Sequence, residues 1–411
     1  MRPGGGSFLF ARCGGRLRRW AASRAAWAAG RRRAIMPVSF RIDETHGLFD
    51  PLTMRGITLR NRIAVSPMCQ YWCEGGLANE WHFVHLGSRA VGGAGLVMAE
   101  ATAVEARGRI SPQDLGLWSD AHIEPLARIV RFIHSQGAAA GIQLAHAGRK
   151  ASTARPWEGG GRVEANQGGW TDVVAPSAER FSPDYPMPAE ISVQGIAEVV
   201  RAFGEAARRA LQAGYRVVEI HAAHGYLLHS FFSPLSNHRG DAYGGSFENR
   251  TRIVREVTEA IRRQWPEKYP LFIRISATDW TQGGWDIEQA VELARMLQPL
   301  GVDLVDCSSG GNVAGAKIPI APGYQAKFAE RIRHEAGIRT GAVGMITSAV
   351  QAEQILRTGQ ADVVLLARQM LRDPYWPMHA ASELGHAASW PVQYQRAAPA
   401  GAPARQPAED A

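Results

Sequence analysis

Residues 217–226 read VVEIHAAHGY, a strand-like run that ends in a cluster of polar side chains. Its apolar beginning is typical of a parallel strand covered on both faces. Seven other short runs have the same character: 62–68, 95–101, 139–144, 271–276, 304–308, 340–344 and 363–367. The segments between the runs are amphipathic at helical spacing, most clearly at 195–213, 249–264, 286–300 and 348–358. This strict alternation predicts an α/β fold, a closed (β/α)8 TIM barrel, as a single domain over residues 37–396.

Two segments depart from the alternation. Residues 151–192 follow the third predicted strand and are rich in Gly, Pro and Trp. Because a long aperiodic stretch is usually functional, we expect this insertion to cap the mouth of the barrel, with a short hairpin. Near the other end of the chain, we expect order from Trp390 to Arg396 and a disordered tail over 397–411. The first strand is not followed by a G-x-G-x-x-G motif, which argues against a dinucleotide-binding Rossmann half.

The formal charge of +8 comes from one short segment. Residues 1–36 contain nine arginines and no Lys, Asp or Glu, which leaves 37 basic residues against 38 acidic ones in the rest of the chain. A nearly neutral body predicts no nucleic-acid partner. The segment is either an Arg-rich presequence or translated upstream DNA with Met36 as the true start, and its three consecutive glycines favour the second reading. In both cases we expect it to be disordered.

The remaining composition predicts a cytoplasmic protein that is not bound to a membrane. No apolar run approaches the roughly 20 residues that a membrane span needs. The four cysteines, Cys13, Cys69, Cys73 and Cys307, form no C-x-x-C pair and no framework for disulfides or iron–sulfur ligation. Reduced thiols in a cytosolic setting are therefore expected.

Polar residues recur where the predicted strands end. They are Cys69, Gln143, His221, His224, Tyr226, Arg274, Gly341, Gly344 and Arg368. Because a barrel builds its active site at the C-terminal ends of its strands, these residues are expected to converge. Gln143 and Arg274 lie inside otherwise apolar runs, where an unpaired polar group is costly. The pattern predicts a cradle for a cofactor.

The segment GAVG at 341–344, together with Arg368, suggests where an anion binds. Barrels often hold a phosphate after their seventh and eighth strands, where glycine lets backbone N–H groups approach and arginine pairs with the anion. The alternative is that the glycines only allow tight packing between strand and helix. The adjacent arginine favours the phosphate site.

The histidine pair also allows two interpretations. His221 and His224 are possible zinc ligands, but a third ligand is then required, and only Glu100 and Glu219 stand near strand ends. Alternatively, two imidazoles make a donor pair for an electronegative oxygen, with Tyr226 as a source of a proton. The arrangement favours the second interpretation and no metal. Cys69 is either a buried apolar thiol or a functional one.

Six motifs resemble the old yellow enzyme family: SPMCQY (66–71), IQLAHAGRK (142–150), EIHAAHGYLLHSFFSPLSNHRGDAYGGSFENR (219–250), RIS (274–276), GAVGMI (341–346) and PVQYQR (391–396). They are most similar to its thermophilic-like branch, and the resemblance covers residues 46–396. The insertion at 151–180, with Trp157 and Trp170, resembles that of the xenobiotic reductases.

The resemblance implies that FMN is the cofactor. The residues it assigns to FMN are Ser66, Pro67, Met68, Cys69, Ala101, Gln143, Arg274, Gly344, Ala367 and Arg368. It implies that the Cys69 thiol tunes the flavin potential, that Gln143 bonds the pyrimidine edge and that Arg274 lies on the N1/O2 side. Gly344, Ala367 and Arg368 are expected to hold the phosphate. Where the family commonly has glycine before this arginine, the chain has Ala367, which is tolerated if its φ is not positive.

The resemblance also implies an activity. His221 and His224 would bind the oxygen of an enone, enal, maleimide or nitroalkene, with a further hydrogen bond from Tyr71. Hydride would pass from NADPH or NADH to FMN and then to the β-carbon, and Tyr226 would donate a proton. Arg396 would reach the site of a neighbouring subunit in a homodimer or homotetramer. The alternatives are a 2,4-dienoyl-CoA-reductase-like flavoenzyme and a flavin-binding protein without ene-reductase turnover.

Overall fold

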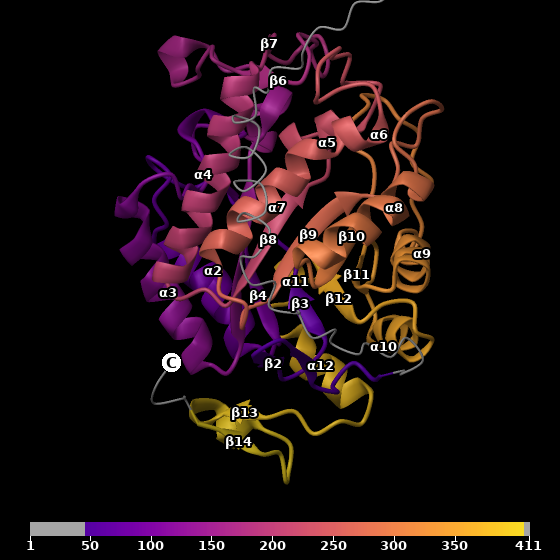
Figure 1. Cartoon of the computed structure of the whole chain (residues 1–411). Helices are drawn as coiled ribbons and strands as arrows, with labels where there is room; N and C mark the ends of the chain where they lie inside the picture. Colours follow the sequence, from indigo (N-terminus) through magenta and orange to yellow (C-terminus); the bar gives the residue numbers. More distant parts are fainter. Residues whose placement is uncertain (1–45, 407–411) are drawn as a thin grey trace, which may run out of the picture. The chain divides into compact units, whose positions relative to one another are not determined.

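Eight parallel strands form a closed barrel in the computed structural model, which describes residues 46–406 (Figure 1). The order around the barrel follows the sequence, and β12 pairs with β3 to close it. The eight predicted strands are confirmed as β3 (Ile63–Val65), β4 (Leu96–Ala103), β5 (Ala139–Ala145), β8 (Val217–Ala222), β9 (Leu271–Ser276), β10 (Leu304–Ser308), β11 (Arg339–Val343) and β12 (Val363–Leu366). Nearly all of their residues are buried, because the helices cover the outer face and side chains fill the interior.

The helices that connect these strands are α2 (Glu80–Val91), α3 (Ile123–Ser135), α4 (Val193–Gln212), α7 (Arg252–Gln264), α8 (Ile287–Leu297), α9 (Ala326–Ala336) and α10 (Ala349–Arg357), and α12 (Trp376–Glu383) follows β12. Side-chain caps set several of their starts: Ser192 accepts from the amide of Gly195, and Asp286 accepts from that of Gln289. The predicted helix 286–300 ends earlier as an α-helix, at Leu297, and continues as the 3-10 turn η6 (Gln298–Leu300). None of the described helices is long and apolar enough to cross a membrane.

A hairpin that the sequence analysis did not anticipate closes the N-terminal end of the barrel. It consists of β1 (Leu52–Met54) and β2 (Ile57–Leu59), which pair in antiparallel fashion. Four of its side chains, Leu52, Met54, Ile57 and Leu59, are buried in one apolar cluster with residues of the barrel strands, including Leu96, Met98, Phe272 and Leu365. The interior of the barrel is therefore plugged by hydrophobic side chains at this end.

The insertion 151–192 lies at the opposite end, where Figure 1 shows β6 (Val174–Ala175) and β7 (Ala189–Glu190) beyond α5 (Leu227–Phe232). It also contains the 3-10 turns η4 (Pro156–Glu158) and η5 (Ala165–Gln167). A short hairpin was expected in the insertion, and an antiparallel bridge joins Thr153 to Arg162 there. In contrast, β6 and β7 pair in parallel.

The C-terminal segment pairs with itself beside the plugged end of the barrel (Figure 1). After η7 (Val392–Ala397), β14 (Ala404–Arg405) pairs in parallel with β13 (Trp390–Pro391), and Arg405 donates to the backbone oxygen of Val91. Part of the tail expected to be disordered is thus a short paired strand. Residues 407–411 and the leader 1–36 lie outside the described residues.

Candidate active site

The C-terminal end of β8 brings three of the predicted residues together. The rings of His221 and His224 lie 5.2 Å apart between centroids and nearly perpendicular, and those of His221 and Tyr226 lie 5.0 Å apart. The chain reverses direction here through two left-handed residues, His224 at φ +60° and Gly225 at φ +72°. This turn aims the two imidazoles and the phenol at one region, as the sequence analysis expected.

Both imidazoles are neutral hydrogen-bonding groups in this environment. Burial lowers the pKa of each well below its usual value, and the positive charges of Arg274 and Lys150 add to that effect. The Nδ1 atom of His221 accepts from the amide of Ala223 at 3.3 Å, which leaves the proton of the neutral ring on Nε2. The Nε2 atom of His224 lies 2.7 Å from the Oγ atom of Ser308 at the end of β10.

The backbone of His224 is fixed by two residues that the sequence analysis did not single out. Its N–H donates to the Oγ atom of Ser276 at 2.9 Å. Its carbonyl accepts from the Nζ atom of Lys150 at 2.7 Å, and the same ammonium also donates to the carbonyl of Gly311. Burial lowers the pKa of Lys150 to about 7. Its position inside the motif IQLAHAGRK was the available signal.

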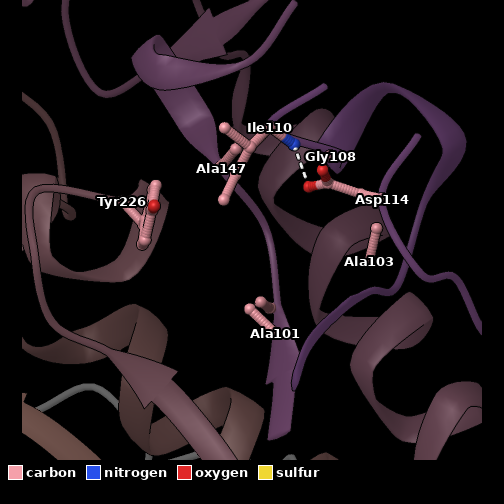
Figure 2. Close-up of a pocket in the computed structure, with 8 residues that line it drawn as sticks. Ala101, Ala103, Gly108, Ile110, Asp114, Ala147 and Tyr226 are labelled. Carbon is pink, nitrogen blue, oxygen red and sulfur yellow. Dashed lines mark hydrogen bonds between the residues drawn. The ribbon is translucent and has the colours of Figure 1, made fainter. Parts of the chain in front are cut away.

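Tyr226 lies against a small cavity, and Figure 2 shows this residue on the side opposite Ala147, Ile110 and Asp114. The cavity has a mostly apolar lining that includes Ala101, Ile110 and Ala147. The carboxylate of Asp114 is its acidic group, and it accepts from the amide of Ile110 at 2.6 Å. Burial raises the pKa of Tyr226 well above its usual value, so the phenol keeps its proton.

Cys69 and Tyr71 form a second group near Tyr226. Burial raises the pKa of the Cys69 thiol well above its usual range, so Cys69 stays a neutral thiol. Tyr71 has a left-handed backbone at φ +51°, and its ring contacts Trp157 edge-on at 5.9 Å between centroids. Trp157 belongs to the insertion, and Trp170, also from the insertion, packs against the same small apolar cluster as Tyr226. The insertion therefore lies against the candidate site.

The centre of the barrel contains a buried polar cluster that explains how two predicted residues are tolerated there. Gln143 donates to the Oε1 atom of Glu219 at 2.7 Å. The Nε atom of Arg274 donates to Asp306 at 2.6 Å, and its Nη2 atom donates to Ser66 at 2.8 Å. The two carboxylates have no exposed surface. The sequence analysis missed Asp306 and considered Glu219 only as a zinc ligand.

The ends of β11 and β12 form the candidate phosphate site. Gly344 adopts φ +114°, and a Cβ atom there would lie 2.6 Å from Nε2 of Gln325, which donates to the carbonyl of Val343. Ala367 has a negative φ of −98°, so the condition under which alanine was expected to replace glycine here is met. Arg368 is exposed beside this turn. Gly341 has a different role, because its Cβ would collide with Leu365 at 2.4 Å, so it serves strand packing.

Two expectations concern residues outside this group. Arg396 is exposed in η7, which lies at the plugged end, so it does not join the other residues within one chain (Figure 1). Within residues 46–406, no group of three His, Cys, Asp or Glu side chains is arranged to hold a metal ion. The zinc interpretation of the histidine pair therefore has no ligand set among these residues.

The donor set fits a flavin mononucleotide. A buried guanidinium and a buried amide lie together in the middle of the barrel, and a turn that requires glycine lies beside an exposed arginine at β11 and β12. The two buried carboxylates retain orphaned oxygens, Oε2 of Glu219 and Oδ1 of Asp306. An amide and a cation suit the heterocycle, and the turn with its arginine suits a phosphate monoester.

Comparisons with known proteins agree with this reading. The chain is 50% identical over 351 residues to an NADPH dehydrogenase of Geobacillus sp. (strain WCH70), covering 85% of this chain and 98% of the relative. Among solved structures, morphinone reductase superposes with a TM-score of 0.71 at 26% identity, over 84% of this chain and 91% of that one. An old yellow enzyme homologue from Zymomonas mobilis gives 0.69 at 27% identity, over 85% and 96%.

The barrel and its donor set define a flavin-dependent oxidoreductase. The chain belongs to the NADH:flavin oxidoreductase / NADH oxidase family, whose sequence profile matches residues 47–386. The resemblance to the old yellow enzymes and the cofactor FMN, with NADPH as reductant among the relatives, are thereby confirmed.

Proposed function

We propose that the protein is an ene-reductase that uses NADPH or NADH to reduce activated alkenes: enones, enals, maleimides and nitroalkenes. The observation that carries the proposal is the grouping of two neutral imidazoles and a protonated phenol, within 5.2 Å between ring centroids, at the open end of the barrel. Bound FMN supplies the redox chemistry, since it accepts hydride from the nicotinamide and delivers it to the β-carbon of the alkene.

The protein supplies binding and polarisation. The Nε2–H group of His221 and the imidazole of His224 hold the carbonyl or nitro oxygen of the substrate, with a further hydrogen bond from Tyr71. Neutral donors of this kind stabilise the negative charge that develops on that oxygen during reduction. Tyr226, which keeps its proton because it is buried, then donates that proton to the α-carbon.

The cradle residues hold the cofactor in this proposal. Gln143 meets the pyrimidine edge of FMN and Arg274 meets its N1/O2 side. The turn at Gly344, with Ala367 and Arg368, binds the phosphate. The lining of the site is completed by Ser66, Pro67, Met68, Cys69 and Ala101.

A second copy of the chain completes the site in this proposal. Arg396 is exposed in η7, which follows β13, and β13 lies beside the plugged end of the barrel, so in this proposal it serves the site of a neighbour. We infer a homodimer or homotetramer in the cytoplasm, in which Arg396 of one subunit contacts the substrate of the next.

Rapid mixing tests the function. The FMN-loaded protein is reduced with NADPH in the absence of oxygen and is then mixed with cyclohexenone. We expect the flavin absorbance to return much faster than in buffer alone. Reduction without alkene-dependent reoxidation would refute the ene-reductase proposal and favour a flavin-binding protein without turnover. Reoxidation by a 2,4-dienoyl-CoA but not by cyclohexenone would favour the other alternative.

A further inference from the structure

The buried cluster in the centre of the barrel contains one more acid than it can neutralise. Glu219 and Asp306 both have no exposed surface, and the cation between them is the single guanidinium of Arg274. The titratable and charged groups that act on Glu219 are Arg274 from β9 and Asp306 from β10, while the Gln143 amide from β5 donates a hydrogen bond. With both acids ionised, a net negative charge would lie in a low-dielectric interior, which is strongly unfavourable.

The geometry shows which acid pairs with the cation. Asp306 accepts from the Nε atom of Arg274 at 2.6 Å, whereas Glu219 lies 3.9 Å from the same nitrogen. Glu219 instead accepts a hydrogen bond from the uncharged Gln143 amide, and its Oε2 atom has no partner among the described residues. Asp306 also has one unpartnered oxygen, its Oδ1 atom, so the distance to Arg274 decides between the two acids. Asp306 is therefore the ionised member of the pair, and Glu219 holds the proton.

We propose that Glu219 is held as a neutral carboxylic acid and is a positioning residue that sets the charge of the flavin cradle and its response to pH. This inference rests on the proposed placement of Gln143 and Arg274 against FMN. Burial first, and then the charge of Asp306, raise the pKa of Glu219 to about 8, against the opposing effect of Arg274.

The proton on Glu219 has a consequence for the flavin. A reduced, anionic flavin beside the cradle favours the protonated acid, so the pKa of Glu219 rises further when the cofactor is reduced. At a pH between the pKa of Glu219 with oxidised flavin and its pKa with reduced flavin, two-electron reduction is accompanied by uptake of two protons from solvent, one by the flavin and one by Glu219. Outside that window only the flavin takes up a proton. The flavin potential should thus depend on pH more steeply in this window.

The first test uses the apoprotein and needs no turnover. We label the protein with carboxyl-¹³C glutamate and record infrared spectra across pH. We expect a protonated-carboxyl band at neutral pH that disappears on titration through about pH 8. Glu219→Gln should lack the band, and so should Asp306→Asn, because Glu219 then becomes the sole anionic partner of Arg274. Glu256→Gln, whose carboxylate accepts from Tyr243 elsewhere, is the matched control and should keep the band.

The second test measures the midpoint potential of bound FMN against pH. For a two-electron couple, one proton corresponds to about 30 mV per pH unit and two protons to about 59 mV. For the wild type we expect the slope of midpoint potential against pH to increase from the one-proton value to the two-proton value above about pH 8. For Glu219→Gln we expect the one-proton slope throughout. The wild-type profile alone is decisive if the variant does not fold.

Two results would overturn the inference: a wild-type apoprotein without a titrating glutamic acid band, or a wild-type potential with a single shallow slope. Neither measurement involves an alkene. A protein that binds flavin but fails to reduce enones therefore still tests Glu219, and the two proposals can fail independently.

Discussion

The Nε2 atom of His224 lies 2.7 Å from the Oγ atom of Ser308, so the orientation of a β8 imidazole is set by a hydroxyl on β10. This contact connects the ends of β8 and β10, which are separated by β9 in the barrel, through one histidine of the candidate oxygen-binding pair. The contact gives Ser308, the last residue of β10, a place in the proposed site.

Replacing Ser308 by alanine should therefore slow reoxidation by cyclohexenone about fivefold, because a buried hydrogen bond contributes about 1 kcal/mol to the orientation of His224. Reduction of the flavin by NADPH should change little, and rapid-mixing kinetics of the two half-reactions separate the effects. Ser309→Ala is the matched control, since its hydroxyl donates to Gln325 instead. Equal losses in both variants would argue against the role of Ser308.

Tyr226→Phe removes the proposed proton donor while keeping the ring. We expect the half-reaction with enones to slow by about 10²- to 10⁴-fold, the usual contribution of a general acid, with flavin reduction nearly intact. Tyr215→Phe is a suitable control, because Tyr215 is buried elsewhere. A comparable loss in the reductive half-reaction would contradict the assignment.

Lys150 should leave a signature in the pH dependence of stability. In the folded protein burial lowers the pKa of Lys150 to about 7, whereas in the unfolded chain the amine has its ordinary pKa of 10.5. Between these values unfolding takes up a proton, so raising the pH stabilises the folded state. Urea unfolding at several pH values should show this rise in the wild type and a flatter profile in Lys150→Met.

The exposed Lys268→Met provides the reference for that experiment. Its profile should run parallel to that of the wild type, because the substitution is at the surface and leaves Lys150 in place. A parallel profile for Lys150→Met as well would show that Lys150 is not a buried amine with a lowered pKa.

Gly344→Ala tests the candidate phosphate turn. The backbone at φ +114° is strained for alanine by about 1–3 kcal/mol, and the new Cβ would meet Gln325 at 2.6 Å. We expect FMN to bind at least tenfold more weakly, as measured by quenching of flavin fluorescence. Gly283→Ala has a positive φ of +76° with open space around it, so it reports strain alone and should leave FMN affinity unchanged.

The barrel was predictable because its strands are buried on both faces and therefore read as continuous apolar runs. The β1–β2 hairpin also had a signal, since Met54-Arg55-Gly56-Ile57 places a two-residue turn between short alternating runs. In contrast, the parallel pairing of β6 with β7 joins two-residue strands, and such short strands carry no periodicity to read.

Only part of the candidate site could be predicted from the sequence. Gln143 and Arg274 were recognised because they interrupt apolar strands. Their hydrogen-bond partners, Glu219 and Asp306, were not recognised, because the sequence does not show which polar residues of different strands contact each other. Lys150 acts through backbone carbonyls of a distant loop, and no sequence spacing encodes that contact.

The hydrophobic plug of Leu52, Met54, Ile57 and Leu59 has a kinetic consequence. Because this end of the barrel is closed, the nicotinamide and the alkene of the proposed reaction would both have to enter from the opposite end. In that proposal each substrate competes with the other for the form of the flavin with which it cannot react, so an excess of either one should inhibit. A closed barrel end thus predicts that the two substrates bind in alternation.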